Sequence, residues 1–409
     1  MYKRLIISGL MKTVSNYPIP NTFRMKVKCA LYVEIEAEEE LAALDFDALP
    51  QPVMVMGGGS NLLFTKDFPG TVLHISSPSP YPCPGVDTSA GGCFVTLPAG
   101  TVFDDFCAWA AAEGLWGPEN LSLIPGECGA SAVQNIGAYG VEAKDIIVGI
   151  RAWDRVEGKF VHIDPATCAY GYRTSKFKTE WKGRFIITAV TYRLSREPQP
   201  RLDYGGLRKA LADRGVETLS QTSGHPRPAP LGQISPLGDD RGDEHSLPER
   251  EGPAGEASGR GREATVGDSV SATLTPQIIR QTIIDIRNAK LPDPAVTGSA
   301  GSFFCNPVIS REHFERIKDI ARQDNGPDYH VPHFEVGDQI KVPAAWMIEQ
   351  CGFKGKRLGG AQVFKNQPLV IVNASGEASP EEIIGLETEV IQAIKSKYGI
   401  TLHPEVEHV

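Results

Sequence analysis

IPGECGASAVQNIGAYG, at residues 124–140, is the stretch that decides the fold of this chain. It combines closely spaced glycines and small residues with the amide side chains of Gln134 and Asn135. We predict a segment that is too irregular for a helix or a strand. Because glycine has no Cβ, such a backbone can lie close against a flat ligand and present N–H donors to it. A loop with a purely structural role is the alternative interpretation.

A second glycine-rich segment, GGGSN at 57–61, directly follows a predicted strand at 52–56. Its backbone N–H groups and the Ser60 hydroxyl could contact a diphosphate. It lacks the Lys-Ser/Thr pair of a P-loop and the spacing of GxGxxG, so a tight turn is the alternative. Two such segments on β scaffolding favour a dinucleotide bound outside a Rossmann fold.

Three short motifs each hold one chemically useful side chain beside glycine or proline: Arg173 in GYRTS, Ser302 in GSFFCNP and Glu405 in HPEVEHV. Arginine keeps its proton and suits the binding of a carboxylate or an enolate. A serine hydroxyl can pass on a proton, and a carboxylate can orient or polarise. Together they indicate chemistry in which negative charge develops and is then protonated. Three unrelated structural residues are the alternative.

Length and composition restrict the class of protein. The 409 residues allow two or three domains, and a formal net charge of −9 argues against a nucleic-acid surface. No stretch approaches the roughly 20 apolar residues of a membrane helix. The N-terminal run is interrupted by Gly9 and Lys12 and lacks a small-residue cleavage site, so we expect no signal peptide. Synthesis could also begin at Met11.

Cysteine and histidine usage favours a reduced protein without a metal. The eight cysteines are scattered and show no CxxC spacing, which predicts neither a disulfide framework nor a zinc site. His330 and His333 form an HxxH pair without a nearby cysteine, and we expect no metal there. The dispersed thiols favour a cytoplasmic protein. From charge and hydropathy we expect no nucleic-acid or membrane partner, and because nothing in the sequence demands a multimer we expect a monomer.

Alternating apolar residues predict strands in the first half of the chain, and helical patterns fall between them. The expected strands are 25–36, 52–56, 71–75, 92–100, 146–154, 159–163 and 183–194, and the expected helices are 37–48 and 103–114. The C-terminal part is expected to hold helices at 275–289, 311–322, 343–351 and 380–397 and a strand at 369–373. This mixture predicts an α+β fold.

The segment 220–269 differs from the rest because it has no Phe, Tyr, Trp or Cys. It cannot bury enough apolar surface to offset an ordering entropy of roughly 1–2 kcal/mol per residue. We predict a disordered insertion, with a partner-binding or regulatory role as the alternative.

Six motifs in order give the chain a family resemblance. GGGSNLL, IPGxxGxxxVQNIGAYGVE, GYRTSxFK, KLPDP, GSFFxNP and HPEV resemble those of the UDP-N-acetylenolpyruvoylglucosamine reductase (UDP-N-acetylmuramate dehydrogenase) family. That family completes UDP-N-acetylmuramate in bacterial cell-wall synthesis. RLDYGG at 201–206 is similar to the tyrosine loop of the family's first subtype. The resemblance covers nearly the whole chain from Asn21, apart from the insertion.

The resemblance implies a vanillyl-alcohol-oxidase-type FAD-binding fold of two α+β subdomains and a separate α+β substrate-binding domain. The boundaries that it implies are an N-terminal extension at 1–20, FAD-binding subdomains at 21–75 and 76–200, the tyrosine loop and connecting helix at 201–291, the substrate-binding domain at 292–402, and a C-terminal segment at 403–409 with the catalytic glutamate.

The resemblance also implies non-covalently bound FAD, with NADPH as the hydride source. By motif match, FAD would contact Gly57, Gly58, Gly59, Ser60, Asn61, Pro125, Gly126, Ala130, Ser131, Gln134, Asn135, Gly137, Ala138 and Tyr139. The UDP part of the substrate would contact Tyr204, Arg287, Lys290 and Asn306. Tyr329 and Gln367 match more loosely.

The mechanism that the resemblance implies has two half-reactions. NADPH reduces the flavin and leaves, and UDP-N-acetylglucosamine enolpyruvate takes its place. A hydride from the flavin N5 attacks the terminal alkene carbon, which gives an enolate-like intermediate beside the carboxylate. Arg173 and Glu405 would stabilise that charge and Ser302 would protonate it, with a water molecule as the alternative acid.

Two positions depart from the family pattern. Arg24 stands where the family usually has glycine, and Cys305 stands where it often has lysine. We expect altered affinity for cofactor or substrate at these positions, with the chemistry kept. Two rival functions stay open on the sequence: a different flavin oxidoreductase, such as a sugar or alcohol oxidase that uses oxygen, and a non-catalytic nucleotide-binding or scaffold protein.

Overall fold

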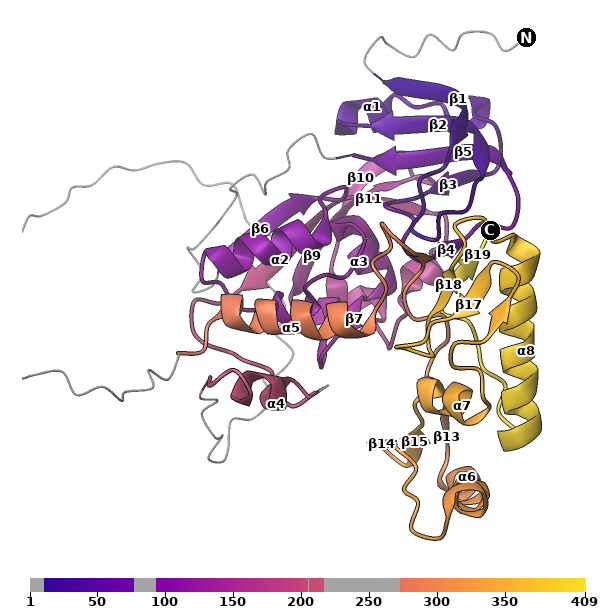
Figure 1. Ribbon diagram of the computed structural model, residues 1–409. Coiled ribbons are helices and arrows are strands. Elements are labelled where there is room, and N and C mark those ends of the chain that lie inside the picture. Colours follow the sequence, from indigo (N-terminus) through magenta and orange to yellow (C-terminus); the bar gives the residue numbers. More distant parts are fainter. Residues whose placement is uncertain (1–10, 77–92, 205, 217–272) are drawn as a thin grey trace, which may run out of the picture.

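The computed structural model describes residues 11–76, 93–204, 206–216 and 273–409. The predicted insertion at 220–269 therefore lies outside the described residues, as do Cys83 and Gly205. Within the described part, helices and strands are mixed along the chain, and the strands form three larger sheets (Figure 1). The α+β expectation is confirmed.

The first sheet has the strand order β1-β2-β5-β3. Its strands are β1 (Lys12–Pro18), β2 (Lys28–Ile35), β3 (Val53–Val55) and β5 (Phe68–Ile75). Strand β2 pairs antiparallel with β1 and parallel with β5, and β3 is parallel to β5. Strand β1 was not predicted. It lies inside the expected N-terminal extension, where its mostly exposed side chains give no apolar alternation.

The second sheet is antiparallel throughout, with the order β10-β9-β11-β6. Its strands are β6 (Cys93–Pro98), β9 (Ile147–Asp154), β10 (Lys159–Ile163) and β11 (Phe185–Leu194). Gly158 turns the β9–β10 hairpin at a φ of +61°, as the sequence predicts. Helix α2 (Phe103–Ala112) shares a core with this sheet through Phe103, Phe106 and Tyr192.

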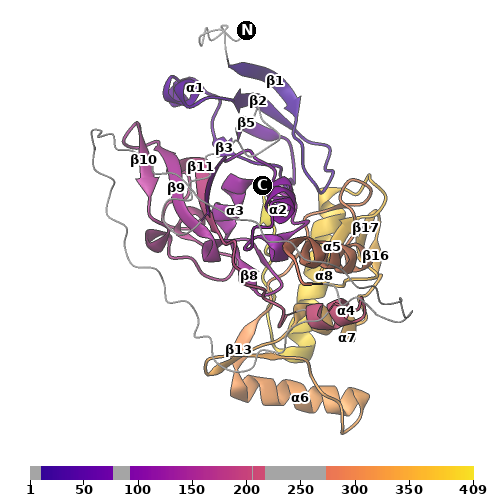
Figure 2. The ribbon, with the colours of Figure 1, turned by 90° about the vertical axis from the view of Figure 1, so that its left-hand side faces the viewer.

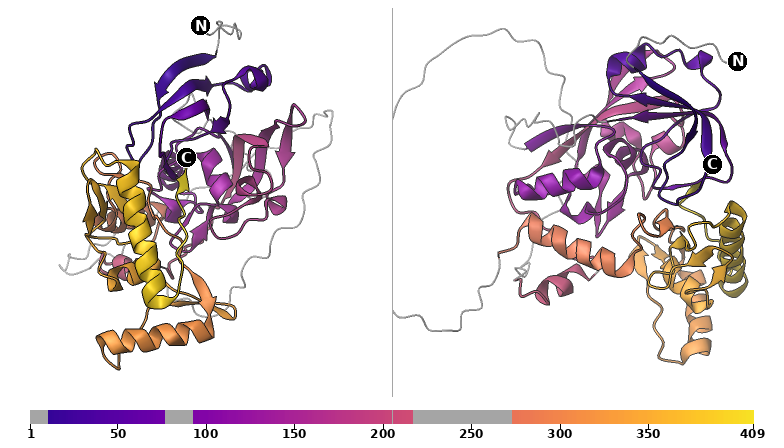
Figure 3. Two further views of the ribbon diagram at one scale, coloured as in Figure 1. Left: turned by 90° about the vertical axis from the view of Figure 1, so that its right-hand side faces the viewer. Right: turned by 45° about the horizontal axis from the view of Figure 1, so that its top comes forward.

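The C-terminal part contains the third sheet, β12-β18-β17-β16, and a small sheet, β13-β15-β14. The strands are β12 (Gly298–Ser299), β13 (Val308–Ser310), β14 (Phe334–Val336), β15 (Gln339–Lys341), β16 (Arg357–Leu358), β17 (Ala361–Val363) and β18 (Ile371–Asn373). The helices are α6 (Arg311–Asn325), α7 (Ala344–Gln350) and α8 (Pro380–Tyr398). Helix α8 runs along the outside of this part and α6 lies at its far end (Figure 3, left).

Local sequence signals explain where the long helices begin and end. Helix α5 (Pro276–Lys290) begins where the Thr275 hydroxyl accepts a hydrogen bond from the Ile278 N–H. Helix α8 begins with a capping box of Ser379 and Glu382 and ends at Gly399, which has a φ of +69°. The short helix α4 (Leu207–Ala212) packs against α5.

One expected helix is shorter than predicted. The range 37–48 contains only α1 (Glu38–Ala42) and a separate 3₁₀ turn, Phe46–Ala48. The cause is Asp45, whose carboxylate accepts hydrogen bonds from the Asp47 and Ala48 N–H groups and so starts a new turn. The other predicted elements named above are present with bounds that differ by a few residues.

The C-terminal part does not have a core to itself. Phe23, Met25, Tyr32 and Phe64 from the first 75 residues belong to the same buried cluster as Phe303 and the core of the α8 region. Helix α5 extends from beside α2 toward the C-terminal part (Figures 1 and 2). The first sheet and the C-terminal part therefore share one core. No helix in the described ranges is both long and apolar enough to span a bilayer.

Candidate active site

A cavity of about 530 Å³ is lined by residues from three parts of the chain: 22–61, 102–173 and 287–405. Nine of the predicted site residues line it: Ser60, Asn61, Pro125, Gln134, Gly137, Arg173, Arg287, Ser302 and Glu405. They come from loops, from helix α3 (Cys128–Gln134), from strand β7 (Gly137–Ala138), from α5 and from the C-terminal segment. The fold thus brings the three predicted catalytic residues to the wall of a single cavity.

The C-terminal segment reaches this cavity because it is hydrogen-bonded on both sides. The Glu405 N–H donates to the Phe303 carbonyl at 2.8 Å, and the Asn61 amide donates to the Glu405 carbonyl at 3.0 Å. Beyond Glu405, strand β19 (Glu407–His408) pairs in parallel with β4 (Leu62–Leu63). Asn61 of GGGSN and Phe303 of GSFF therefore hold the backbone of Glu405 from two sides, and this fixes the position of its carboxylate.

Arg173 and Glu405 form an ion pair in the cavity wall. Arg173 Nε lies 3.2 Å from Glu405 Oε1, and their side chains are 23% and 9% exposed. The Gln134 amide donates to the same carboxylate oxygen at 3.2 Å. Arg173 Nη2 also donates to the Gly137 carbonyl at 2.6 Å. Because so little of the pair is exposed, water screens its charges weakly. The attraction between the Arg173 guanidinium and a bound anion is therefore stronger than it would be at the surface.

The backbone around Arg173 is held in an unusual conformation. Arg173 has a φ of +55°, in the left-handed region that favours glycine. The buried Asn135 donates to the Gly171 carbonyl at 2.8 Å, and the Ser175 hydroxyl donates to the Val133 carbonyl at 2.5 Å. These bonds fasten the GYRTS turn to the segment 128–135. Such strain is found where function requires a fixed side chain.

The segment 124–140 is more regular than predicted. It contains helix α3 (Cys128–Gln134) and the short strand β7 (Gly137–Ala138), which pairs with β8 (Val141–Glu142). The prediction of a wholly irregular segment was wrong. A Cβ on Gly129 would lie 2.7 Å from the Cβ of Ala99, so the glycine allows α3 to pack closely on the end of β6.

The glycines at 57–59 make a close backbone approach to their neighbours. A Cβ on Gly57 would lie 2.8 Å from Glu127 Oε2, and one on Gly59 would lie 2.7 Å from the Pro20 carbonyl. Gly59 also has a φ of +63°. The Ser60 hydroxyl donates to the Pro125 carbonyl at 3.1 Å, which joins the two glycine-rich segments.

Several residues predicted to contact the cofactor do not line the cavity, and their side chains or backbones contact other parts of the protein. The buried Ser131 donates to the Cys128 carbonyl, and Asn135 ends α3 in the left-handed conformation. Tyr139 packs against α5. Gly57, Gly58, Gly59, Gly126, Ala130 and Ala138 are also absent from the cavity wall.

The four residues predicted to bind UDP are not gathered together. Arg287 lines the cavity, whereas Lys290 is exposed at the end of α5. Tyr204 is 43% exposed and stacks on Phe334, with ring centroids 6.0 Å apart. Asn306 accepts a hydrogen bond from the Ala344 N–H, at the start of α7.

The structure adds wall residues that the sequence did not suggest, among them Thr22, Asp104 and Leu123. Asp104 carried no signal because an acidic residue in the first turn of a helix is ordinary. Leu123 precedes the glycine-rich segment but has no polar side chain. Its φ of +60° could not be predicted from a leucine.

Both departures from the family pattern lie close to the site. Arg24 has a φ of +59°, and its guanidinium donates to the carbonyls of Val296 at 2.7 Å and Ala295 at 3.2 Å. Burial, followed by the charge of Glu405, raises the pKa of the Cys305 thiol. The thiol is therefore protonated at neutral pH.

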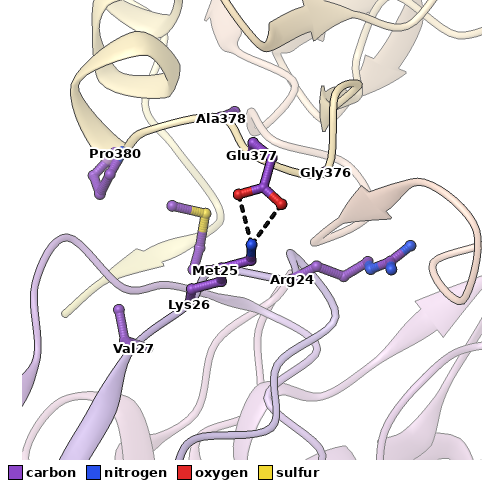
Figure 4. A pocket seen from close by; sticks show the side chains of 8 residues that line it. All are labelled: Arg24, Met25, Lys26, Val27, Gly376, Glu377, Ala378 and Pro380. Atoms are coloured by element: carbon purple, nitrogen blue, oxygen red, sulfur yellow. Dashed lines mark hydrogen bonds and ion pairs between the residues drawn. The ribbon is translucent and has the colours of Figure 1, made fainter.

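A second cavity, of about 200 Å³, lies between residues 24–27 and 376–380 (Figure 4). Lys26 Nζ spans it and contacts both carboxylate oxygens of Glu377, at 2.5 and 2.6 Å. None of the predicted site residues lines this second cavity. Across the described ranges, no group of three or more His, Cys, Asp or Glu side chains could hold a metal ion.

Comparisons with known proteins agree with this site. Residues 29–164 match the family model of an FAD binding domain, and residues 293–409 match the C-terminal domain of UDP-N-acetylenolpyruvoylglucosamine reductase. The chain is thus an FAD-dependent oxidoreductase whose N-terminal half contains an FAD-binding domain.

The relatives identify the family more closely. The chain is 38% identical over 394 residues to the UDP-N-acetylenolpyruvoylglucosamine reductase of Bacteroides fragilis (strain YCH46), an alignment that covers 95% of this chain and 97% of the relative. It is 34% identical over 398 residues to the enzyme of that name from Porphyromonas gingivalis (strain ATCC BAA-308 / W83), with 96% and 98% covered. The chain belongs to the UDP-N-acetylenolpyruvoylglucosamine reductase family.

A solved structure supports the fold. The crystal structure of the reductase from Thermus caldophilus aligns with a TM-score of 0.56 at 18% identity, and covers 97% of this chain and 98% of that chain. The resemblance inferred from the six motifs is confirmed, and so is the FAD cofactor. The oxidase and scaffold alternatives are set aside by the family.

Proposed function

We propose that this enzyme uses NADPH to reduce the enolpyruvyl ether of UDP-N-acetylglucosamine enolpyruvate, which gives UDP-N-acetylmuramate for peptidoglycan. The observation that carries the proposal is the ion pair of Arg173 and Glu405, which shares one cavity wall with Ser302. A guanidinium, a carboxylate and a hydroxyl in the wall of one cavity suit a reaction that forms and then protonates an enolate.

The residues around the cavity fit FAD. Gly57 and Gly59 pack closely against Glu127 and Pro20, and this packing sets the course of the backbone that brings Ser60 and Asn61 to the cavity wall. Backbone N–H groups and the Ser60 hydroxyl of this segment would contact the diphosphate of FAD. Asn61, Pro125, Gln134 and Gly137 would contact the rest of the cofactor from the cavity wall. When bound, FAD supplies hydride chemistry that no side chain can perform.

Arg173 is the residue that would bind the substrate carboxylate. Its side chain is aimed by the Gly137 carbonyl and by Glu405, and its left-handed backbone fixes the starting direction of that side chain. The guanidinium would stabilise the negative charge as it forms beside the carboxylate. Glu405 would keep the guanidinium in place and polarise the same group.

Ser302 would deliver the proton to the carbon that carries the substrate carboxylate. It follows Gly301, whose φ of +72° turns the backbone at the cavity wall. A serine hydroxyl is a weak acid, so the cation of Arg173 and a partly dry site would have to favour the transfer. A water molecule hydrogen-bonded to Ser302 is the competing acid.

The UDP part of the substrate would extend toward Arg287. Arg287 is the member of the predicted UDP-binding set that lines the cavity. Tyr204, Lys290 and Asn306 remain proposed contacts for a substrate that reaches past the wall. The NADPH step and the cytoplasmic location are proposed in the same way, because NADPH and UDP-linked sugars are made inside the cell. A monomer is proposed because one chain supplies all three predicted catalytic residues to the cavity.

The experiment is anaerobic turnover with NADPH and the enolpyruvyl substrate. We expect substrate-dependent NADPH oxidation and a product that is two hydrogens heavier by mass spectrometry. NADPH consumption that requires oxygen and forms hydrogen peroxide, with the enolpyruvyl ether unchanged, would instead indicate an oxidase. A mutant at Glu407, which is exposed and pairs with Lys182 at 2.5 Å, serves as a control outside the cavity.

A further inference from the structure

Leu123, in the cavity wall, is held in a left-handed conformation by contacts on both sides of its backbone. Its φ is +60°. Its N–H donates to Asp104 Oδ1 at 2.5 Å, and its carbonyl accepts from Arg287 Nη2 at 3.1 Å. A branched side chain disfavours this conformation, so the surrounding structure must impose it.

Asp104 is the fixed end of this chain of contacts. It stands in the first turn of α2 and forms a two-point ion pair with Arg280, with Nη1–Oδ1 at 2.5 Å and Nη2–Oδ2 at 3.0 Å. Burial raises the pKa of Asp104, but the Arg280 guanidinium and the Leu123 N–H outweigh burial and hold that pKa below its usual range. The carboxylate that accepts the hydrogen bond from the Leu123 N–H is therefore charged.

Among the described residues, Arg287 has one hydrogen bond to define the direction of its guanidinium. It follows Arg280 by two helical turns, so both side chains leave α5 on nearly the same face. Within the described residues, the Leu123 carbonyl is its hydrogen-bond acceptor, and its buried Nε has no partner. The direction of the guanidinium thus depends on where the Leu123 carbonyl points.

We propose that Asp104 is a positioning residue, which fixes the Arg287 guanidinium on the cavity wall through the strained backbone of Leu123. The proposal rests on the proposed function of Arg287 as a contact to the UDP part of the substrate. Asp104 would then act on substrate affinity, while Arg173, Ser302 and Glu405 determine the chemical step. A residue that only stabilised the fold would not separate these two quantities.

The test is a double-mutant cycle in the FAD-bound enzyme, with UDP as the probe in calorimetry. We expect Arg287→Ala to weaken UDP binding about tenfold, as for the loss of one charged contact, and Asp104→Asn to weaken it about three- to tenfold. In the Arg287→Ala background, Asp104→Asn should add nothing further. In turnover, Asp104→Asn should raise KM with kcat largely kept.

The chain offers a matched control and a second variant. Asp105→Asn removes the same charge from the next position of α2, where the side chain is exposed and does not line the cavity. It should leave UDP affinity unchanged. Asp104→Glu keeps the charge but moves the carboxylate, so it should weaken UDP binding and show the same dependence on Arg287. It replaces Asp104→Asn if that variant does not fold.

Three results would overturn the proposal. Independent, additive losses in the double mutant would mean that Asp104 does not act through Arg287. A fall in kcat with unchanged UDP affinity would give Asp104 another role. Unchanged UDP affinity in Arg287→Ala would refute the substrate role of Arg287 itself, a failure that the Asp104 variants alone could not produce.

Discussion

Arg173 Nε lies 3.2 Å from Oε1 of Glu405, although the two residues are far apart in the sequence. Arg173 lies in the connection between β10 and β11 of the second sheet, and Glu405 lies in the last segment of the chain. The contact exists because the GYRTS turn is tied to α3 while the C-terminus runs between GGGSN and GSFF. Hydrogen bonds within the protein therefore bring the cation and the carboxylate together.

Loss of either member of this pair should reduce turnover strongly. We expect Arg173→Ala and Glu405→Gln each to lower kcat by about 10²–10³, because each removes a preorganised charge from the site. Glu407→Gln, two positions beyond Glu405, removes an exposed carboxylate and should keep nearly full activity. Steady-state kinetics on the three variants is the measurement. Equal losses in all three would point to a disturbed C-terminal segment.

The glycine backbone at 57–59 should be sensitive by position. Gly59→Ala requires a left-handed alanine, at about 1–2 kcal/mol, and places its Cβ 2.7 Å from the Pro20 carbonyl. Gly58 has a negative φ, and the nearest atom to an added Cβ lies at 3.9 Å. Fluorescence titration with FAD should show a large loss of affinity for Gly59→Ala and a small one for Gly58→Ala. The reverse order would contradict a cofactor bound against this backbone.

Arg24 offers a test of backbone strain. Arg24→Gly and Arg24→Ala both lose the hydrogen bonds to residues 295 and 296, but only glycine also removes the left-handed strain at a φ of +59°. We expect Arg24→Gly to be more stable than Arg24→Ala by about 1 kcal/mol in denaturant unfolding. Equal stabilities would show that the left-handed conformation is not kept in solution.

The C-terminal segment should be held more firmly at low pH. The carboxylate of Glu387 in α8, whose Oε2 lies 3.2 Å from His408 Nε2, raises the pKa of His408 above its usual value of 6.5. The pair therefore contributes its full stability below the unfolded pKa and loses it as pH rises through the raised folded pKa. His408→Asn should lower the thermal midpoint at about pH 6 and have less effect at about pH 8.5. A constant difference at both pH values would contradict this linkage.

The sequence could predict most of the helices and strands, and it singled out three side chains that the fold brings to one cavity. Thr275 and Ser379 mark helix starts, and glycine or proline beside Arg173, Ser302 and Glu405 indicated fixed backbones. These signals are local, so a single sequence contains them.

The rest depends on contacts between distant segments. Helix α3 was missed because Gly129 suits a helix only when Ala99 lies against it. Strand β1 was missed because its side chains are mostly exposed and give no apolar pattern. It is held in the sheet by its antiparallel pairing with β2. The roles of Asp104 and Leu123 appear only once α2 and α5 are side by side (Figure 1).

The most direct test follows both half-reactions of Ser302→Ala by anaerobic stopped-flow absorbance. NADPH should bleach the flavin band at nearly the wild-type rate, whereas the return of the band on addition of UDP-N-acetylglucosamine enolpyruvate should slow by about 10² or more, as for the loss of a general acid. An equal loss in both half-reactions, or an unchanged second one, would contradict Ser302 as the proton donor.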